Sequence, residues 1–284
     1  MATPKVSVLT PIYNTDVCHL RECIESVLNQ TFSDFEFIIL NDSPENKALD
    51  ALVASFDDTR IRYVKNDKNM GISASRNKLL GLARGEYIAI FDHDDICVTD
   101  RLAAQVEFLD SNPAVGVVSG LLEVFGINGT ECILPAPEND TDIKIMTMRD
   151  CCVAHSAAMI RKSVLDENNI CYEAYFPPAE DYRLWARLMA VTRFYNIQRV
   201  LVKYRNHDNR TSIVQNARMT AAHRAIALDL RNSFPAYYRE MRHSDTAGIT
   251  IFRLRLFGVV PLLKIKNNRV LLFEAIPVFR IFWR

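Results

Sequence analysis

The sequence predicts an α/β fold built on a doubly wound parallel sheet. Strand and helix signals alternate over the first 120 residues, as in chains made of βαβ units. The segment 37–40 is apolar without alternation, which is typical of a parallel strand that helices cover on both faces. Polar side chains follow three of the expected strands, at Asn14, at Asp42 and at 92–95. Because such sheets bind ligands beyond the carboxyl ends of their strands, these positions indicate a binding crevice.

The expected elements follow one another closely. Apolar residues of the first helix recur at helical spacing: Leu20, Cys23, Ile24, Val27 and Leu28. Up to residue 119 we expect strands at 6–12, 35–40, 61–64, 87–91 and 114–119, and helices at 17–29, 46–56, 73–84 and 99–111. Glycines and prolines between 126 and 137 then indicate a hairpin-like excursion. It is followed by expected helices at 141–149 and 180–191, strands at 193–198 and 200–205, and further helices past 209.

Composition excludes several classes of protein. Lys plus Arg equals Asp plus Glu at 34 each, which argues against a nucleic-acid-binding protein that works through bulk positive charge. The seven cysteines are odd in number and lack Cys-x-x-Cys spacing, so we interpret them as reduced core residues of a cytosolic protein without a zinc site. No signal peptide and no run of 18 apolar residues is present, which favours a cytoplasmic location. The glycine-rich phosphate loops of dinucleotide oxidoreductases and P-loop enzymes are missing.

The last 34 residues form a basic and apolar tail. The segment 256–265 is echoed by 272–281, and Asn267 and Asn268 between them predict the turn of a hairpin. From 251 to 284 there are seven Lys or Arg and one acidic residue. Such a tail suits an anionic membrane surface, which would make the protein peripheral on the inner face of the cytoplasmic membrane. The alternative is that the tail packs on the domain or in a homo-oligomer contact.

An acidic cluster follows the apolar run 87–91. Asp92, Asp94 and Asp95, with His93 among them, place three carboxylates at the end of a buried strand. Carboxylates so close repel one another, so the pattern makes most sense if a hard cation such as Mg²⁺ or Mn²⁺, with a phosphate behind it, binds there. The alternative is a solvated loop in which Asp95 caps the next helix.

Several motifs, taken in order, resemble those of bacterial family-2 glycosyltransferases with the GT-A fold. They are the segments 6–14, 26–31, 35–42, 69–77, 92–95, 180–185 and 204–207, so the resemblance covers about residues 4–212. It implies a GT-A fold, in which helices flank a mostly parallel central sheet. It further implies a catalytic domain at 1–212, with a nucleotide-binding half (1–119) and an acceptor-binding half (120–212), and a helical and hairpin extension at 213–284.

The resemblance also assigns residues to a nucleotide-sugar donor and a divalent cation. Asp94 would hold Mn²⁺ or Mg²⁺ with help from Asp92 or Asp95 and from His207, although Asp92 could instead hold the ribose, and His207 could be a surface residue. Asp42 would accept hydrogen bonds from the base, and Arg76 and Arg205 would face the diphosphate. The other expected donor-binding residues are Thr10, Pro11, Tyr13, Asn14, Asn69 and Gly71. A turn role for Asp42 and an exposed helix position for Arg76 are the structural alternatives.

On the acceptor side, the resemblance makes Asp181 the general base, and Glu180, His155 and Trp185 acceptor-binding residues. Simple capping of a helix is the alternative for Glu180 and Asp181. The implied reaction is inverting transfer of a sugar to a hydroxyl of a glycan or lipid-linked acceptor. A UDP-sugar is the favoured donor. The implied setting is the synthesis of bacterial surface polysaccharide, lipopolysaccharide or capsule. Two rivals are a sugar-nucleotide nucleotidyltransferase, for which the loop after the first strand lacks a glycine-rich basic motif, and a catalytically inactive relative that binds glycan or acts as a scaffold.

Overall fold

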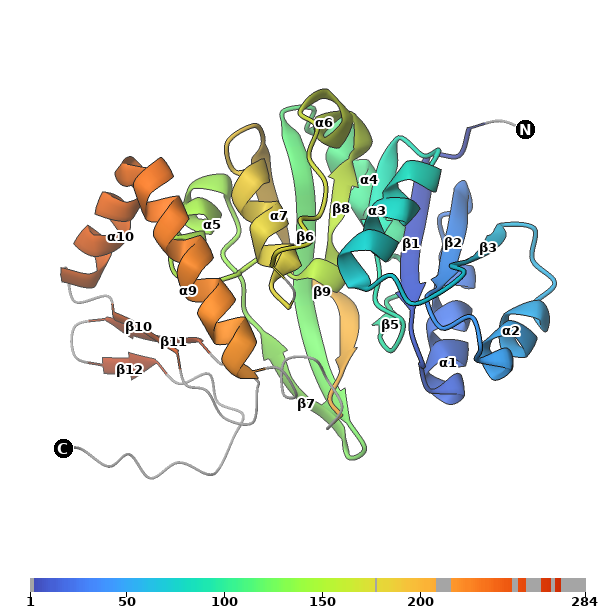
Figure 1. Ribbon diagram of the computed structural model, residues 1–284. Coiled ribbons are helices and arrows are strands. Elements are labelled where there is room, and N and C mark those ends of the chain that lie inside the picture. The colour runs from blue at the N-terminus through green and yellow to red at the C-terminus, as the bar shows by residue number, and fades with distance from the viewer. Residues whose placement is uncertain are drawn as a thin grey trace.

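The computed structural model describes residues 3–176, 178–207, 216–246, 250–253, 262–266 and 269–271. Its centre is a nine-stranded sheet in the order β3-β2-β1-β4-β8-β6-β9-β5, with β7 paired to β6 (Figure 1). The strands are β1 (Val6–Ile12), β2 (Phe35–Asn41), β3 (Ile61–Lys65), β4 (Tyr87–Ile90), β5 (Ile96–Cys97), β6 (Val115–Gly126), β7 (Gly129–Leu134), β8 (Met159–Arg161) and β9 (Arg193–Arg205).

Most of the sheet is parallel, as the sequence predicts. β1 pairs in parallel with β2 and β4, β2 with β3, and β6 with β9. The short strand β8 runs antiparallel to both of its neighbours, β4 and β6, so β6 and β9 keep the direction of β4. The carboxyl ends of β1, β2, β4 and β9 therefore lie at one edge of the sheet.

Helices cover both faces of the sheet, and strand residues alternate between two cores. Leu9, Ile38 and Ile88 belong to the core that contains residues of α3, α5, α7 and α9. Val8 and Phe37 belong to the core of α1, α2 and α4. The helices are α1 (Val17–Leu28), α2 (Lys47–Ala54), α3 (Ile72–Leu82), α4 (Arg101–Ser111), α5 (Asp140–Thr147), α6 (Lys162–Glu167), α7 (Glu180–Leu188), α9 (Asn216–Ser233) and α10 (Pro235–Thr246).

Three expectations about the elements need correction. The strands expected at 193–198 and 200–205 form one continuous strand, β9, because its pairing with β6 accommodates the interruption as irregularities of register. β5, β8 and α6 were not expected, since two, three and six residues are too short to show a period. All seven cysteines are free, as expected, but Cys18 and Cys171 are exposed, and only Cys23 and Cys97 lie in the core.

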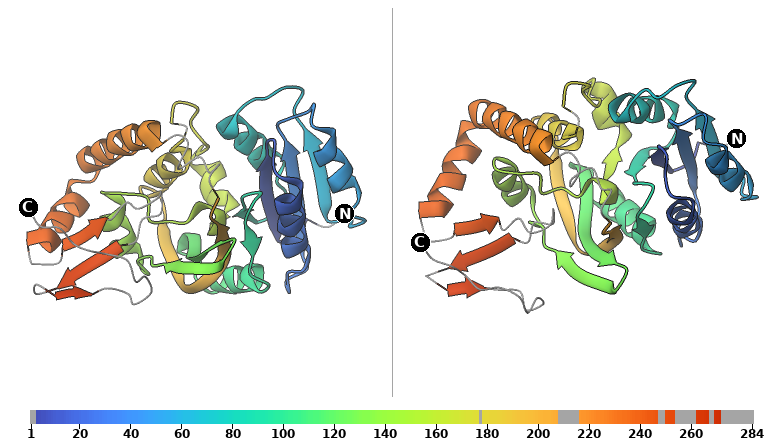
Figure 2. Two further views of the ribbon diagram at one scale, coloured as in Figure 1. Left: turned by 90° about the horizontal axis from the view of Figure 1, so that it is seen from below. Right: turned by 60° about the horizontal axis from the view of Figure 1, so that its bottom comes forward.

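The C-terminal elements lie at the end of the molecule opposite to β3 and α2 (Figures 1 and 2). α9 packs against α7, and α10 packs against α5. A second sheet has the order β10 (Thr250–Arg253), β11 (Leu262–Lys266), β12 (Arg269–Leu271). β11 pairs with β12 in antiparallel fashion, while the expected turn at 267–268 and the second copy of the tail repeat, 272–281, lie outside the described residues. No helix in the described part of the chain is long and apolar enough to cross a membrane.

Candidate active site

The acidic cluster that follows β4 meets the end of β9 at the carboxyl edge of the sheet. His207 Nε2 and Asp94 Oδ2 share a hydrogen bond of 2.8 Å, although 113 residues separate them in the sequence. Burial would raise the pKa of Asp94, but the hydrogen bond from His207 and the nearby charges of His93 and His207 lower it to about 2. Asp94 is therefore ionised at neutral pH, next to an imidazole.

Arg205 fixes the shape of the acidic loop. Its backbone N–H donates to Asp95 Oδ1 at 2.9 Å, and its Nε donates to the carbonyl oxygen of Asp94 at 2.8 Å. Its Nη2 forms an ion pair with Glu22 of α1, and the guanidinium lies over the ring of Phe125. The side chain expected to contact phosphate is thus engaged with protein groups. Sequence reasoning did not identify Glu22, because no local pattern links residues 183 positions apart.

The innermost carboxylate of the cluster is Asp95. Its side chain is fully buried, and burial together with the negative charges of Asp94 and Asp92 raises its pKa well above the usual range. Such a carboxyl group is best suited to hold the loop through Arg205, whereas Asp94 and Asp92 are partly exposed. Among the three acids, the structure therefore separates a buried anchor from two accessible groups.

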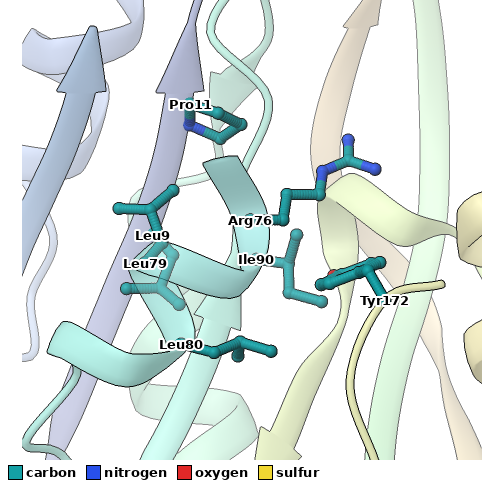
Figure 3. A pocket seen from close by; sticks show the side chains of 7 residues that line it. All are labelled: Leu9, Pro11, Arg76, Leu79, Leu80, Ile90 and Tyr172. Carbon is teal, nitrogen blue, oxygen red and sulfur yellow. The ribbon is translucent and has the colours of Figure 1, made fainter. Parts of the chain in front are cut away.

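Arg76 joins the acidic cluster to the start of α7. Nη2 donates to Asp92 Oδ1 at 3.1 Å, and Nη1 donates to Glu180 Oε1 at 2.5 Å. Burial disfavours the charge of Arg76, but Asp92 and Glu180 more than compensate and raise its pKa. Figure 3 shows Arg76 extending from α3 next to the ring of Tyr172. Arg76, expected to face the diphosphate, thus has two carboxylates as its immediate partners.

A narrow pocket lies beneath Arg76. It is lined by Leu9, Pro11, Arg76, Leu79, Leu80, Ile90 and Tyr172 (Figure 3) and offers only about 10 Å³, which is room for about one water molecule. It is therefore too small for a nucleotide. Pro11, expected to line a base pocket, is buried against this space.

Asp42 holds the loop that leads into α3. Its Oδ1 accepts from Asn66 Nδ2 at 2.6 Å and from the N–H of Met70 at 2.8 Å, and its Oδ2 accepts from the N–H of Gly71 at 2.9 Å. A carboxylate has about four acceptor positions, so one remains at Oδ2 for an N–H of a base. Asn69 accepts from the same Gly71 N–H through Oδ1 at 2.9 Å and is otherwise exposed. Gly71 has φ +82° and ψ 163°, a conformation that is essentially restricted to glycine.

The segment after β1 divides into buried and exposed residues. Thr10 is fully buried, and its hydroxyl donates to the carbonyl oxygen of Phe91 at 3.0 Å, so it braces β1 against the end of β4 instead of lining an open pocket. Tyr13 is 50% exposed and has a ring face available for stacking on a base. Asn14 is exposed with a left-handed φ of 45°, and its N–H donates to the Ser43 hydroxyl at 3.1 Å.

Glu180 and Asp181 form the first turn of α7. The Asp181 Oδ1 accepts from the N–H of Tyr182 at 2.7 Å. Burial raises the pKa of Asp181, while the charges of His223 and Arg76 act against that rise. Burial also raises the pKa of Glu180. Glu180 Oε2 is buried without a hydrogen-bond partner among the described residues.

His155 and Trp185, expected to bind an acceptor, are core residues in this structure. His155 shares a hydrogen bond of 2.8 Å with the Tyr172 hydroxyl, and burial and the charge of Arg76 lower its pKa well below the usual range. Trp185 is 1% exposed and packs between His155 and Phe194. The apolar face of α7 turns Trp185 toward the sheet, so this side chain does not contribute a surface for an acceptor.

The residues at the acidic edge suit a divalent cation in part. Asp94 and His207 offer one carboxylate oxygen and one ring nitrogen, and Asp92 adds a partly exposed carboxylate. These are ligand types that Mn²⁺ and Mg²⁺ accept, with the remaining positions left to water and phosphate. Among the described residues no group of three or more His, Cys, Asp or Glu is arranged to enclose a metal ion. Asp94, His207 and Asp92 are thus the residues at this edge that would hold such a cation.

A mostly parallel sheet, an acidic loop at its carboxyl edge and paired acids at the start of α7 are features expected of glycosyltransferases with the GT-A fold. The family model of glycosyl transferase family 2 matches residues 7–168. An uncharacterized glycosyltransferase of Methanocaldococcus jannaschii is 33% identical over 226 residues, which are 77% of this chain and 77% of that protein. The chain belongs to glycosyl transferase family 2, and its fold is GT-A.

Further similarities relate the chain to named proteins. The amylovoran biosynthesis glycosyltransferase AmsE of Erwinia amylovora is 28% identical over 203 residues, covering 70% of this chain and 75% of AmsE. The crystal structure of S. aureus TarS residues 1–349 with UDP-GlcNAc has a TM-score of 0.64 at 21% identity and covers 80% of this chain and 67% of that one. The mannosyltransferase PcManGT of Pyrobaculum calidifontis, solved with GDP-Man and Mn²⁺, has a TM-score of 0.58 at 16% identity and covers 88% and 77%.

Proposed function

We propose that the protein is a metal-dependent, inverting glycosyltransferase that moves a sugar from a UDP-sugar to a hydroxyl of a glycan or lipid-linked acceptor. The observation that carries this proposal is Arg76, which contacts Asp92 at the donor edge and Glu180 at the start of α7. One buried side chain thereby connects the carboxylates expected to serve the leaving group with those expected to serve the acceptor. Family membership argues against the nucleotidyltransferase alternative.

The donor would lie across the carboxyl edge of the sheet. Tyr13 would stack on the base, and the remaining acceptor position of Asp42 would take an N–H from it. Because TarS was solved with UDP-GlcNAc, a uridine nucleotide is the first choice; PcManGT, with GDP-Man, is a more distant relative in structure. Asp94 and His207, with Asp92 beside them, would hold Mn²⁺ or Mg²⁺, which as a Lewis acid neutralises charge on the departing diphosphate.

The acceptor would be activated by Asp181. Inverting transfer needs one carboxylate that removes the proton of the attacking hydroxyl on the face opposite the leaving group. Burial raises the pKa of Asp181, which makes its carboxylate a stronger base than an exposed aspartate. Glu180, held by Arg76, would orient the acceptor, while Arg205 would maintain the acidic loop without contacting phosphate itself.

The wider setting is also a proposal. We assign residues 1–212 to the catalytic domain and 213–284 to an extension, and we place the reaction in surface-polysaccharide synthesis, as the name of AmsE suggests. The basic tail at 251–284 would bind an anionic membrane surface. Partition of the full chain and of a chain ending at residue 250 onto anionic vesicles tests this assignment, and equal partition would contradict it.

Donor binding gives the direct test of function. We expect UDP-sugars to raise the melting temperature only when Mn²⁺ is present, since a ligand at about 100 times its Kd stabilises the native state by about 2.7 kcal/mol. Asp94→Asn should remove the Mn²⁺-dependent part of this shift. Asp229→Asn, a substitution of an exposed acid on α9, is the matched control and should keep it. Equal shifts for the wild type and Asp94→Asn would exclude Asp94 as a ligand.

A further inference from the structure

The C-terminal helix α9 brings a histidine and its acidic partner to the helix that carries the proposed base. His223 Nδ1 lies 3.0 Å from Asp150 Oδ1, and both side chains are largely buried. The His223 ring lies 5.0 Å from the ring of Tyr182, the residue that follows Asp181. Tyr182 itself is fixed, because its hydroxyl donates to the carbonyl oxygen of Thr147 at 2.5 Å.

α9 is held firmly in this position. Ile226 and Leu230 are buried in the core that includes α7. Arg183 of α7 forms an ion pair of 2.5 Å with Asp229 of α9. These contacts would keep α9 on α7 without His223, so its imidazole is not needed merely to attach the helix. A buried His–Asp pair costs desolvation energy that an apolar pair of similar size would avoid.

The surroundings of Asp181 give His223 an electrostatic role. Asp181 interacts electrostatically with titratable or charged groups of several elements. They are Arg76 of α3, Asp92 after β4, Cys151 and Tyr172 of the connecting segments, Glu180 of α7 and His223 of α9. Arg76 already forms ion pairs with Asp92 and Glu180. Burial raises the pKa of Asp181, and the positive charge of His223, whose ring contacts the ring of the next residue, Tyr182, acts against that rise.

We propose that His223, held by Asp150, is a positioning residue that favours the ionised form of Asp181 and thereby sets the lower pH limit of sugar transfer. The catalytic role of Asp181 rests on the proposed function; the contact between His223 and the start of α7 does not. By this assignment, the C-terminal extension completes the acceptor side of the site.

The electrostatic link can be measured without a substrate. We would titrate the imidazole signals of the six histidines by two-dimensional NMR in the full-length wild type, Asp181→Asn and Asp229→Asn. Coupling is reciprocal, so loss of the Asp181 charge should lower the proton affinity of His223 by about twofold or more. Asp229→Asn also removes one negative charge, from an exposed position on α9, and should leave the midpoint of the His223 titration nearly unchanged. An equal midpoint in the wild type and Asp181→Asn would overturn the inference.

Turnover supplies the second readout. We would follow release of UDP from UDP-GlcNAc with Mn²⁺ across pH in the wild type and His223→Gln, since glutamine keeps a polar contact with Asp150 but carries no charge. The acid limb of kcat should move to higher pH in the variant, with activity at the alkaline plateau retained; an unmoved limb would contradict the proposal. If the wild type turns over neither UDP-GlcNAc nor any other UDP-sugar of a panel, the proposed function fails, whereas the NMR coupling still decides the role of His223.

Discussion

The ion pairs of Arg76 offer the sharpest test of how the site is held together. In Arg76→Met the helix keeps a long unbranched side chain, but Glu180 loses its cation. The Arg76 side chain is 10% exposed and that of Glu180 is 9%, so water cannot replace the lost partner. Removing one member of a buried pair costs about 3–5 kcal/mol. Asp92 is more exposed and can be hydrated, which places the expected loss of unfolding free energy near the lower end, about 3 kcal/mol.

The stability loss in Arg76→Met should depend on pH and should be partly recovered by a second substitution. Burial raises the pKa of Glu180 even with Arg76 present, and without Arg76 it rises further, so the folded variant binds a proton that the unfolded chain releases. A carboxylate with a raised folded-state pKa loses stability as pH rises, and Arg76→Met should therefore be more destabilised at pH 8 than at pH 5. Adding Glu180→Met removes the unpaired charge and should recover part of the loss.

Urea unfolding followed by circular dichroism at both pH values measures these differences. Arg84→Leu is the control, because Arg84 is 47% exposed and its partner Glu36 keeps Arg62; an exposed pair is worth about 0.2–1 kcal/mol. A loss below about 1 kcal/mol in Arg76→Met, or a double variant as unstable as the sum of its singles, would refute the view that Arg76 neutralises buried carboxylates.

Three further outcomes are expected. Asp181→Asn should bind donor with unchanged affinity but lose roughly 10²- to 10⁴-fold in turnover, and full turnover in this variant would end the assignment of the base. Gly71→Ala should lower the unfolding free energy by about 1–3 kcal/mol, because alanine is strained at φ +82°, ψ 163° although nothing lies within 4 Å of its added carbon; a neutral effect in urea unfolding would show that the turn relaxes. Asp94 has a folded-state pKa of about 2, below the usual 3.8, so its ionised form should add to the unfolding free energy above pH 4, and this contribution should be lost as pH falls toward 2. In His207→Gln the unfolding free energy should therefore fall less over this pH range than in the wild type, as acid unfolding would measure.

The sequence was most informative where chemistry is local. Apolar runs predicted the parallel strands, and the polar residues that end them identified the carboxyl edge, because both signals lie within a few residues of each other. The pairing of Asp94 with His207 was anticipated as a shared cation site, and the structure brings the two side chains into contact. Periodicity alone placed α7 with Glu180 and Asp181 in its first turn.

Other features depend on tertiary contacts that no local pattern encodes. Arg76 and Glu180 are 104 residues apart, and their ion pair exists only because α3 and α7 pack on the same face of the sheet. Arg205 was expected to contact phosphate, but its guanidinium forms an ion pair with Glu22 of α1. The resemblance assigned Trp185 to the acceptor, but this side chain is 1% exposed and packs against His155 and Phe194.

The three residues of β8 have a consequence for how the site can move. Within the described sheet, β4 and β6 are joined only through Met159–Arg161, so this short strand is a seam between the β1–β4 set and the β6–β9 pair. The acidic loop 92–95 crosses this seam, because it leaves β4 on one side and enters β5, which pairs with β9, on the other. The hydrogen bonds of Arg205 to Asp94 and Asp95, and of His207 to Asp94, therefore tie the two strand sets together at the carboxyl edge and limit how far they can twist against each other.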